Sequence, residues 1–164
     1  MSSSPSIYLD ANATTSLDPA VIDAMTPYLT DRFGNPSSLH REGTTARDAI
    51  RVARRQTATL IGAKPAEIVF TGSGSEANNM AIRGVLESNP NIRHIVTSAV
   101  EHSSVLATCA YLKDKGYEVT RLGVDSGGAI DMAALKTALT EHASPSLVSL
   151  MWANNETGVM FPVE

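Results

Sequence analysis

Residues 92–122, IRHIVTSAVEHSSVLATCAYLKDKGYEVTRL, decide the fold of this chain. They begin with a short apolar run rich in β-forming residues, 92–97, and end with a second such run, 118–122. Between the two runs, residues 103–115 have the pattern of a helix that stops at Gly116. Two strands joined through a helix predict a crossover connection, and hence a parallel strand pair with the helix packed on one face.

The same alternation continues on both sides of this stretch. Before it we expect a strand at 67–71 (EIVFT) and a helix at 75–86. After it we expect Asp131 to cap a helix that runs to about 141, and 147–152 (LVSLMW) to form a fourth strand. The chain is therefore predicted to have an α/β fold, with a mostly parallel sheet and helices on both of its faces. Such sheets bind ligands beyond the carboxyl ends of their strands.

Two further helices are expected before the first strand. Asp18 and Pro19 start one that runs through Leu29, and apolar residues near helical spacing predict another over 41–61. The 164 residues suffice for one domain of ordinary size but not for two large ones. We therefore expect a flexible N-terminus at 1–6 and a single, incomplete α/β domain over 7–164.

Composition argues against several classes of function. Thirteen Lys and Arg against seventeen Asp and Glu give a net charge of −4, so neither nucleic acid nor an anionic membrane is an expected partner. No apolar run approaches the roughly 18 residues of a spanning helix, and the first residues lack the pattern of a secretory or mitochondrial signal. The single cysteine, Cys109, cannot form an internal disulfide, which is typical of a reducing compartment, so a cytoplasmic location is expected.

A turn of small residues, TGSGSEANN at 71–79, opens directly into the 75–86 helix. Its two glycines, at 72 and 74, allow several backbone N–H groups to point toward one place. The hydroxyls of Ser73 and Ser75 add donors at the positive end of the helix dipole, so the turn is typical of a phosphate site. A serine that merely caps the helix explains the same residues equally well, because capping and anion binding use the same groups.

Two further polar clusters follow strands. His102 comes after the 92–97 strand, where an imidazole can stack on a flat ligand or transfer a proton, although a lone histidine is more often structural. Asn154, Asn155 and Glu156 come after the 147–152 strand and offer directional hydrogen bonds to a ligand, or ordinary turn chemistry. Because the carboxyl ends of parallel strands share one edge, we expect the three clusters to converge there.

Other reactive side chains have structural interpretations. None of the four lysines follows a strand end. Cys109 lies in an apolar helical stretch and is expected to be buried, not nucleophilic. His40, His94 and His142 have no metal-ligand spacing with one another or with Cys109, so no metal site is expected.

Five segments, taken in order, resemble the first part of the cysteine desulfurases. These are class V, fold-type I enzymes that use pyridoxal 5′-phosphate (PLP). The segments are YLDANATT (8–15), FGNPSSLH (33–40), EIVFTGSGSEANN (67–79), EHSSVL (101–106) and NNETG (154–158). The resemblance extends from about residue 7 to the last residue, and it implies the N-terminal part of the large PLP-binding domain.

The resemblance also implies roles for particular residues. Gly74 and Ser75 would hold the cofactor phosphate, with Ser75 standing where the family usually has threonine. His102 would stack on the pyridine ring and help to transfer protons. Asn155 would hydrogen-bond the phenolic oxygen of the ring or the carboxylate region of the substrate. The residues near the substrate entrance would be Asn12, Asn35 and Ser38.

In the family, the reaction removes sulfur from L-cysteine and leaves L-alanine and an enzyme persulfide, which supplies iron–sulfur cluster or thio-cofactor assembly. The cofactor-binding lysine and the nucleophilic cysteine lie downstream of the NNETG motif. The resemblance therefore implies an N-terminal portion that is inactive until the remaining portion or a second chain supplies these groups, and a dimer in the complete enzyme. Two alternatives stay open: a non-catalytic module that binds PLP or phosphate or caps a partner, and a selenocysteine lyase or another class V relative.

Overall fold

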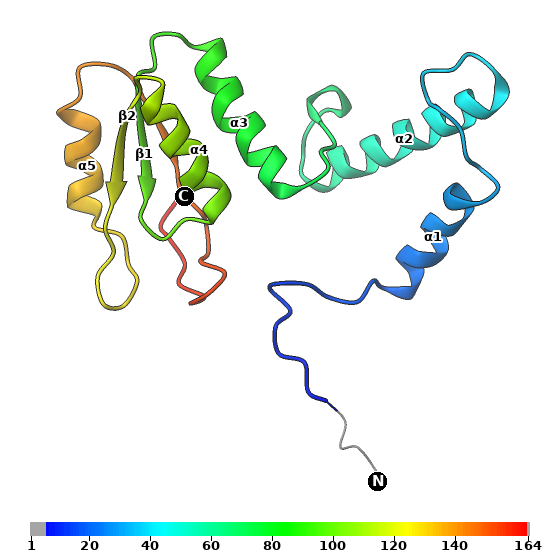
Figure 1. Cartoon of the computed structure of the whole chain (residues 1–164), viewed down its shortest axis with the longest axis horizontal. Coiled ribbons are helices and arrows are strands. Elements are labelled where there is room, and N and C mark those ends of the chain that lie inside the picture. Colours follow the sequence, from blue (N-terminus) through cyan, green and yellow to red (C-terminus); the bar gives the residue numbers. More distant parts are fainter. Residues whose placement is uncertain (1–5, 164) are drawn as a thin grey trace. The chain divides into compact units, whose positions relative to one another are not determined.

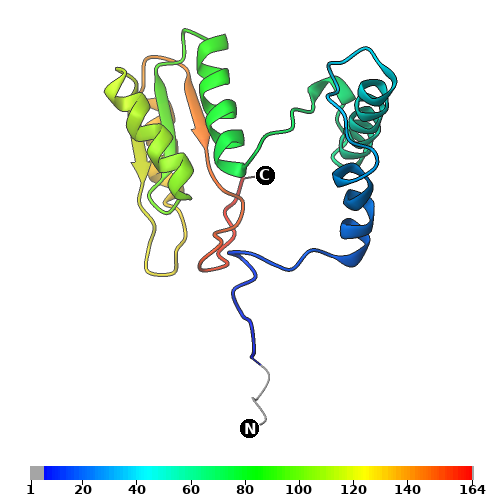
Figure 2. The same cartoon turned by 45° about the vertical axis from the view of Figure 1, so that its right-hand side comes forward.

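The structure is a computed structural model that describes residues 6–163. Its residues group into two compact units, Met1–Phe70 and Thr71–Glu164, each of which is described here by itself (Figures 1 and 2). The flexible start expected at 1–6 lies, except for residue 6, outside the described residues. The single incomplete domain expected over 7–164 stays a prediction.

The second unit contains a parallel sheet. Its strands are β1 (His94–Ser98), β2 (Glu118–Leu122) and β3 (Ser146–Ser149), in the order β2-β1-β3. Both outer strands pair parallel with β1, and the register aligns His94 with Glu118 on one side and with Ser146 on the other. The predicted α/β fold with a parallel sheet is confirmed.

Three helices of this unit begin at residues that cap them. Helix α3 (Gly74–Ser88) begins after Ser73, α4 (Ser103–Asp114) after His102, and α5 (Met132–Thr140) after Asp131, whose Oδ1 accepts from the N–H groups of the second and third helical residues. After α4, Gly116 adopts a positive φ of 90°, a conformation that glycine takes without steric cost. Local capping chemistry therefore places the helix ends near their predicted positions.

Alternate residues of β1 point into two separate cores. Ile95 packs with α3 and α4 on one face, whereas Val96 packs with α5 and the chain's last segment on the other. Figure 1 shows α3 and α4 on one side of the sheet and α5 on the opposite side. The first core consists of Ile82, Leu86, Ile95, Val105, Cys109 and Leu112. The second consists of Val96, Leu122, Ile130 and Phe161. Helices therefore cover both faces, as predicted.

A buried histidine joins the three strands near their amino ends. The His94 ring lies 2.8 Å from the hydroxyl of Ser146 in β3 and 2.8 Å from the hydroxyl of Thr120 in β2. It also stacks on His142 with 4.0 Å between ring centroids, and burial followed by the charge of His142 lowers the pKa of His94. His94, one of the three histidines without metal-ligand spacing, therefore links the strands of the sheet through buried side-chain hydrogen bonds.

The first unit is helical. Its elements are α1 (Pro19–Leu29), α2 (Arg41–Leu60) and a short 3-10 helix, η1 (Pro65–Glu67). The loop before α2 lies directly on Gly43, where an added Cβ would come within 2.5 Å of the Ser38 carbonyl oxygen and 2.7 Å of that of Asn35. Glycine at position 43 is therefore required by this close approach of two backbones.

The strand expected at 67–71 is absent, and the strand expected at 147–152 is the shorter β3, Ser146–Ser149. In the first case η1 ends at Glu67 and the following residues pair with no strand among the described residues. The Ile68 carbonyl instead accepts a hydrogen bond from Arg54, whose guanidinium lies over the Phe70 ring. β-forming residues cannot form a strand without a neighbouring strand to satisfy their backbone groups.

Among residues 6–163, no helix is both long enough and apolar enough to cross a bilayer.

Leu86 offers a direct test of the core between the sheet and α3. Its side chain is 1% exposed, so Leu86→Ala should lower the free energy of unfolding by about 2–5 kcal/mol through lost burial and a residual cavity. Leu139→Ala, on a 41% exposed leucine of α5, should cost less than about 1 kcal/mol. Urea unfolding followed by circular dichroism measures both, and equal losses would contradict this packing.

Candidate functional site

The carboxyl edge of the sheet brings together two loops that are far apart in the sequence. Strands β1 and β3 run in parallel, so the loop after Ser98 and the loop after Ser149 leave the sheet at the same edge. In Figure 1 the loop that precedes α4 and the red C-terminal segment both lie at the end toward which the strand arrows point. His102 belongs to the first loop and Asn155 to the second.

Glu101 holds these two loops to each other. Its Oε1 accepts a hydrogen bond of 2.7 Å from the Met151 N–H and one of 3.3 Å from the Ser98 hydroxyl. The side chain is 8% exposed, and this burial raises the pKa of Glu101 against the opposing effect of the two hydrogen bonds. Nothing local in the sequence marks Glu101, because the hydrogen-bond partner of its carboxyl group lies 50 residues away.

Asn154 makes a second link between the loops. Its Nδ2 donates to the Val100 carbonyl oxygen at 3.1 Å, and its Oδ1 accepts from the N–H groups of Glu156 and Thr157 at 2.9 Å each. This buried amide therefore fixes the turn, which leaves its neighbour Asn155 exposed with Nδ2 donating to Glu156 Oε1 at 2.9 Å. Of the two adjacent asparagines, one builds the loop and the other presents its side chain at the surface.

The N-terminus of α3 carries exposed hydrogen-bond donors. The Ser73 hydroxyl accepts from the Glu76 N–H at 3.2 Å, so Ser73 is the helix cap. The N–H groups of Gly74 and Ser75, in the first helical turn, have no intrahelical acceptor. A Cβ added at Gly74 would meet no atom within 4 Å, so the space in front of the turn is open. Ser73 therefore supplies the cap, and the predicted phosphate contact of Gly74 and Ser75 stays a prediction.

His102 is linked to α3 through Ser104 and Asn78. It is exposed and caps α4, with Nδ1 accepting from the Ser104 N–H at 3.1 Å. The Asn78 side chain of α3 donates to the Ser104 hydroxyl at 2.9 Å, which joins the two helix N-termini. A hollow of about 360 Å³ runs between them, lined by Ser75, Asn79, Ser103, Ser104, Ala107, Thr108 and Tyr111. The predicted phosphate turn and the predicted ring-stacking histidine are thus connected by a direct chain of contacts.

The three residues expected at the substrate entrance belong to the first unit. Asn12 lies in a turn in which Asp10 accepts from the Ala13 N–H. Asn35 uses its Oδ1 to accept from the Ser37 N–H at 2.9 Å, and its carbonyl accepts from the Ser38 N–H at 2.9 Å. These are local hydrogen bonds that stabilise the turns in which the residues lie. The assignment of Asn12, Asn35 and Ser38 to the substrate entrance stays a prediction.

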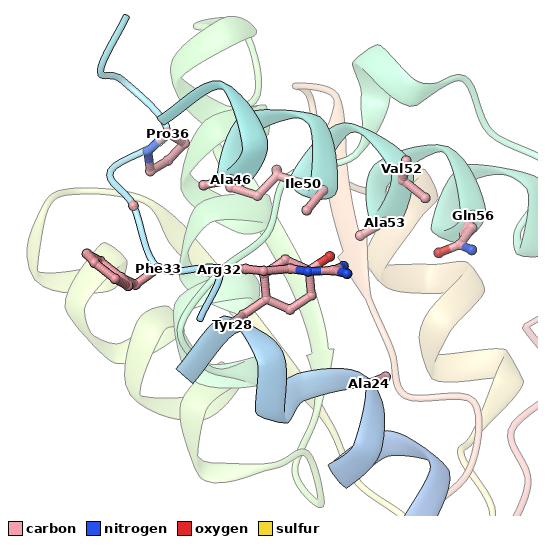
Figure 3. Close-up of a pocket in the computed structure, with 12 residues that line it drawn as sticks. Ala24, Tyr28, Arg32, Phe33, Pro36, Ala46, Ile50, Val52, Ala53 and Gln56 are labelled. Carbon is pink, nitrogen blue, oxygen red and sulfur yellow. The ribbon is translucent and has the colours of Figure 1, made fainter. Parts of the chain in front are cut away.

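A separate cavity of about 610 Å³ lies between α1 and α2 in the first unit. Figure 3 shows Tyr28 and Arg32 on the α1 side facing apolar residues of α2, among them Ala46 and Ile50. None of the residues that line it is one of the predicted site residues. Its lining is mostly apolar, with polar groups from Tyr28, Arg32 and Gln56.

Cys109 is fully buried in the first core, and burial raises the pKa of its thiol. A thiol without access to solvent and with a raised pKa is a poor nucleophile, so the predicted structural role is confirmed. Within residues 6–163, no three His, Cys, Asp or Glu side chains are grouped as a metal site requires.

Comparison with known proteins defines the family. The sequence model of the Aminotransferase class-V family matches residues 7–164, so the chain belongs to this family.

Within the family, the similar proteins are cysteine desulfurases. The chain is 51% identical over 158 residues to the cysteine desulfurase of Nostoc sp. (strain PCC 7120) and 53% identical over 159 residues to that of Sinorhizobium fredii. Each match covers 96% of this chain but only 39% and 41% of the respective relative. The chain thus spans about two fifths of the length of the curated relatives that it matches.

Solved structures agree with the sequence relatives. A NifS-like protein, 37% identical, superposes with a TM-score of 0.88 over 96% of this chain and 43% of its own. SspA in complex with cysteine, also 37% identical, superposes with a TM-score of 0.87 over 96% of this chain and 45% of its own. The resemblance seen in the five motifs is confirmed at the level of fold and family.

The buried carboxyl of Glu101 predicts a pH dependence of stability. Because burial raises the pKa of Glu101 above 4.5 in the folded chain, the folded state binds more protons than the unfolded state from about that pH up to the raised value. The contribution of this group to stability therefore falls as pH rises through that window. The advantage of wild type over Glu101→Gln in unfolding free energy should shrink over the same window.

Urea unfolding at a series of pH values measures this difference. The control is Glu141→Gln, which removes an exposed carboxylate at the end of α5. If the difference in unfolding free energy between wild type and Glu101→Gln instead grew as the pH rises, the proposed effect of burial would be contradicted.

Proposed function

We propose that this chain supplies the phosphate-binding and ring-binding part of a PLP-dependent cysteine desulfurase. The proposal is supported by family membership and by relatives named cysteine desulfurases. The neighbour SspA, which was solved in complex with cysteine, supports L-cysteine as the substrate. The observation that carries the proposal is the open N-terminus of α3, joined through Asn78 and Ser104 to an exposed histidine.

The residues present fit the cofactor. Two backbone N–H groups at the positive end of a helix, with the hydroxyl of Ser75 beside them, suit a phosphate dianion. The exposed imidazole of His102 offers a flat face for a pyridine ring, and the amide of Asn155 offers a directional polar contact. When bound, PLP withdraws electrons from the substrate carbon and so makes its bonds easier to break.

The chain's own residues would act by binding and by hydrogen bonding. Gly74 and Ser75 would anchor the phosphate and so fix the position of the ring. His102 would hold the ring by stacking and would hold a proton at Nε2 for a hydrogen bond to the ligand, since Nδ1 accepts from the Ser104 N–H. Asn155 would orient the oxygen of the ring or the carboxylate of the substrate.

We propose that two reactive groups come from polypeptide beyond this chain, either its continuation or a second chain. Desulfurization requires a lysine that holds the cofactor and a cysteine that accepts the sulfur. Cys109 is buried, and no lysine of the sequence follows a strand end. The length of the relatives, of which this chain covers 39–41%, leaves room for both groups.

We further propose that the complete enzyme is a cytoplasmic dimer. The sequence has a single cysteine and so cannot form an internal disulfide, which supports a reducing compartment. Half-exposed apolar side chains of α1, including Val21, Ile22 and Met25, support coverage of that helix by further protein surface.

A chimera tests the proposed activity. Residues 7–164 would replace the matching segment of the Nostoc sp. desulfurase, which shares 51% identity with them. With a dithiol reductant present to reduce the enzyme persulfide, the chimera should release sulfide and form alanine from L-cysteine, whereas the isolated chain should do neither because it lacks the lysine and the reactive cysteine. A folded, PLP-loaded chimera without sulfide release would contradict the proposal, as would robust activity of the isolated chain.

The phosphate contact is tested in the same chimera with Ser75→Ala. Loss of one hydrogen bond to a charged phosphate should weaken PLP binding by about 10- to 100-fold. The control is Ser88→Ala, which makes the same change at the other end of α3, away from the positive end of its dipole. Equilibrium dialysis of PLP measures both variants, and equal affinities would remove Ser75 from the site.

A further inference from the structure

Ser104 occupies an unusual position between two helices. Its hydroxyl oxygen lies 2.8 Å from His102 Nδ1 and accepts from Asn78 Nδ2 at 2.9 Å. The residue is 8% exposed, and its carbonyl accepts from the Thr108 hydroxyl at 2.7 Å, which holds it in place within α4. Neither Ser104 nor Asn78 was expected in the site from the sequence.

The directions of these hydrogen bonds follow from the chemistry of the groups. An amide NH₂ can only donate, so Asn78 uses a lone pair of the Ser104 oxygen and leaves the hydroxyl proton for another acceptor. The Ser104 N–H, which can only donate, lies 3.1 Å from His102 Nδ1 and makes that atom an acceptor, so the Ser104 hydroxyl also donates to Nδ1, at 2.8 Å. An Nδ1 atom that accepts two hydrogen bonds carries no proton, so the neutral ring carries its proton on Nε2.

We propose that Ser104 and Asn78 are positioning residues that hold His102 in the Nε2–H tautomer and fix the orientation of its ring. The functional meaning of this arrangement rests on the proposed function, in which His102 donates a hydrogen bond from Nε2 to the ligand, but the tautomer itself does not. Asn78 lies on the helix whose first turn would bind the phosphate. The same short chain of polar contacts therefore ties the ring orientation of His102 to the phosphate-binding end of α3.

A variant that reverses the direction of the hydrogen bond between residue 78 and Ser104 distinguishes control of the tautomer from simple packing. In Asn78→Asp the new side chain has nearly the same shape but can only accept, so the Ser104 hydroxyl should turn its proton toward the carboxylate. Its lone pair would then face Nδ1 and favour a proton there. The ratio of the Nε2–H to the Nδ1–H tautomer should fall by about two- to tenfold, the effect of one ordinary hydrogen bond.

The measurement is the ¹⁵N spectrum of the imidazole in the 164-residue chain without cofactor, at about pH 8.5. Signals of the four histidines are assigned with His102→Gln. Asn79→Asp is the matched control, because it adds the same charge on the next residue of α3, whose Nδ2 bonds only to the Ser75 carbonyl in its own helix. Ser104→Ala, compared with Ser103→Ala, removes the hydroxyl itself.

In wild type, we expect the His102 ring to be mainly the Nε2–H tautomer. Asn78→Asp should lower the ratio of the Nε2–H to the Nδ1–H tautomer, and Asn79→Asp should not. Ser104→Ala should lower the same ratio by a smaller amount. A mainly Nδ1–H wild type overturns the proposal without any variant. Equal shifts in the two aspartate variants, or an unchanged ratio in Ser104→Ala, also overturn it. Since no cofactor is used, these outcomes are independent of whether the chimera releases sulfide.

Discussion

The buried Glu101 carboxylate is the contact on which the geometry of the candidate site depends. It accepts the Met151 N–H and the Ser98 hydroxyl, so it joins the two loops that leave β1 and β3 at the carboxyl edge. His102 follows it directly in the chain. Asn154 makes a second link between the same two loops, because its side chain donates a hydrogen bond to the Val100 carbonyl oxygen. With both links in place, His102 and Asn155 are held at one edge although about fifty residues separate them.

The fold was predictable wherever it depends on local chemistry. Asp18, Ser73 and Asp131 cap their helices because short polar side chains satisfy the first free N–H groups, and this pattern is visible in the sequence. The strand expected at 67–71 fails for the opposite reason. Its residues favour a strand, but a strand exists only through its partner, and Arg54 takes the Ile68 carbonyl instead.

The candidate site was predictable only in its exposed members. His102 and Asn155 lie in loops that follow strands, as the strand-end rule predicts, whereas only the family resemblance still marks Gly74 and Ser75, because the strand expected before them is absent. The structure places all four on the second unit. Glu101, Ser104 and Asn78 were missed because each acts through a side-chain contact. Two of these contacts link residues 26 and 50 positions apart, and no periodicity or spacing records such a pairing.

These two groups of residues divide the work of the site. The residues that would meet a ligand are exposed, so their donors remain hydrated and their presence costs the fold little. The residues that hold them in place are mostly buried and hydrogen-bonded, where a polar group left without a partner would be costly. Glu101, Asn154 and Ser104 therefore hold the loops in place, and their sequence neighbours His102 and Asn155 would contact a ligand. A site built in this way keeps its shape without a ligand, because none of its supporting hydrogen bonds is one that a ligand would have to supply.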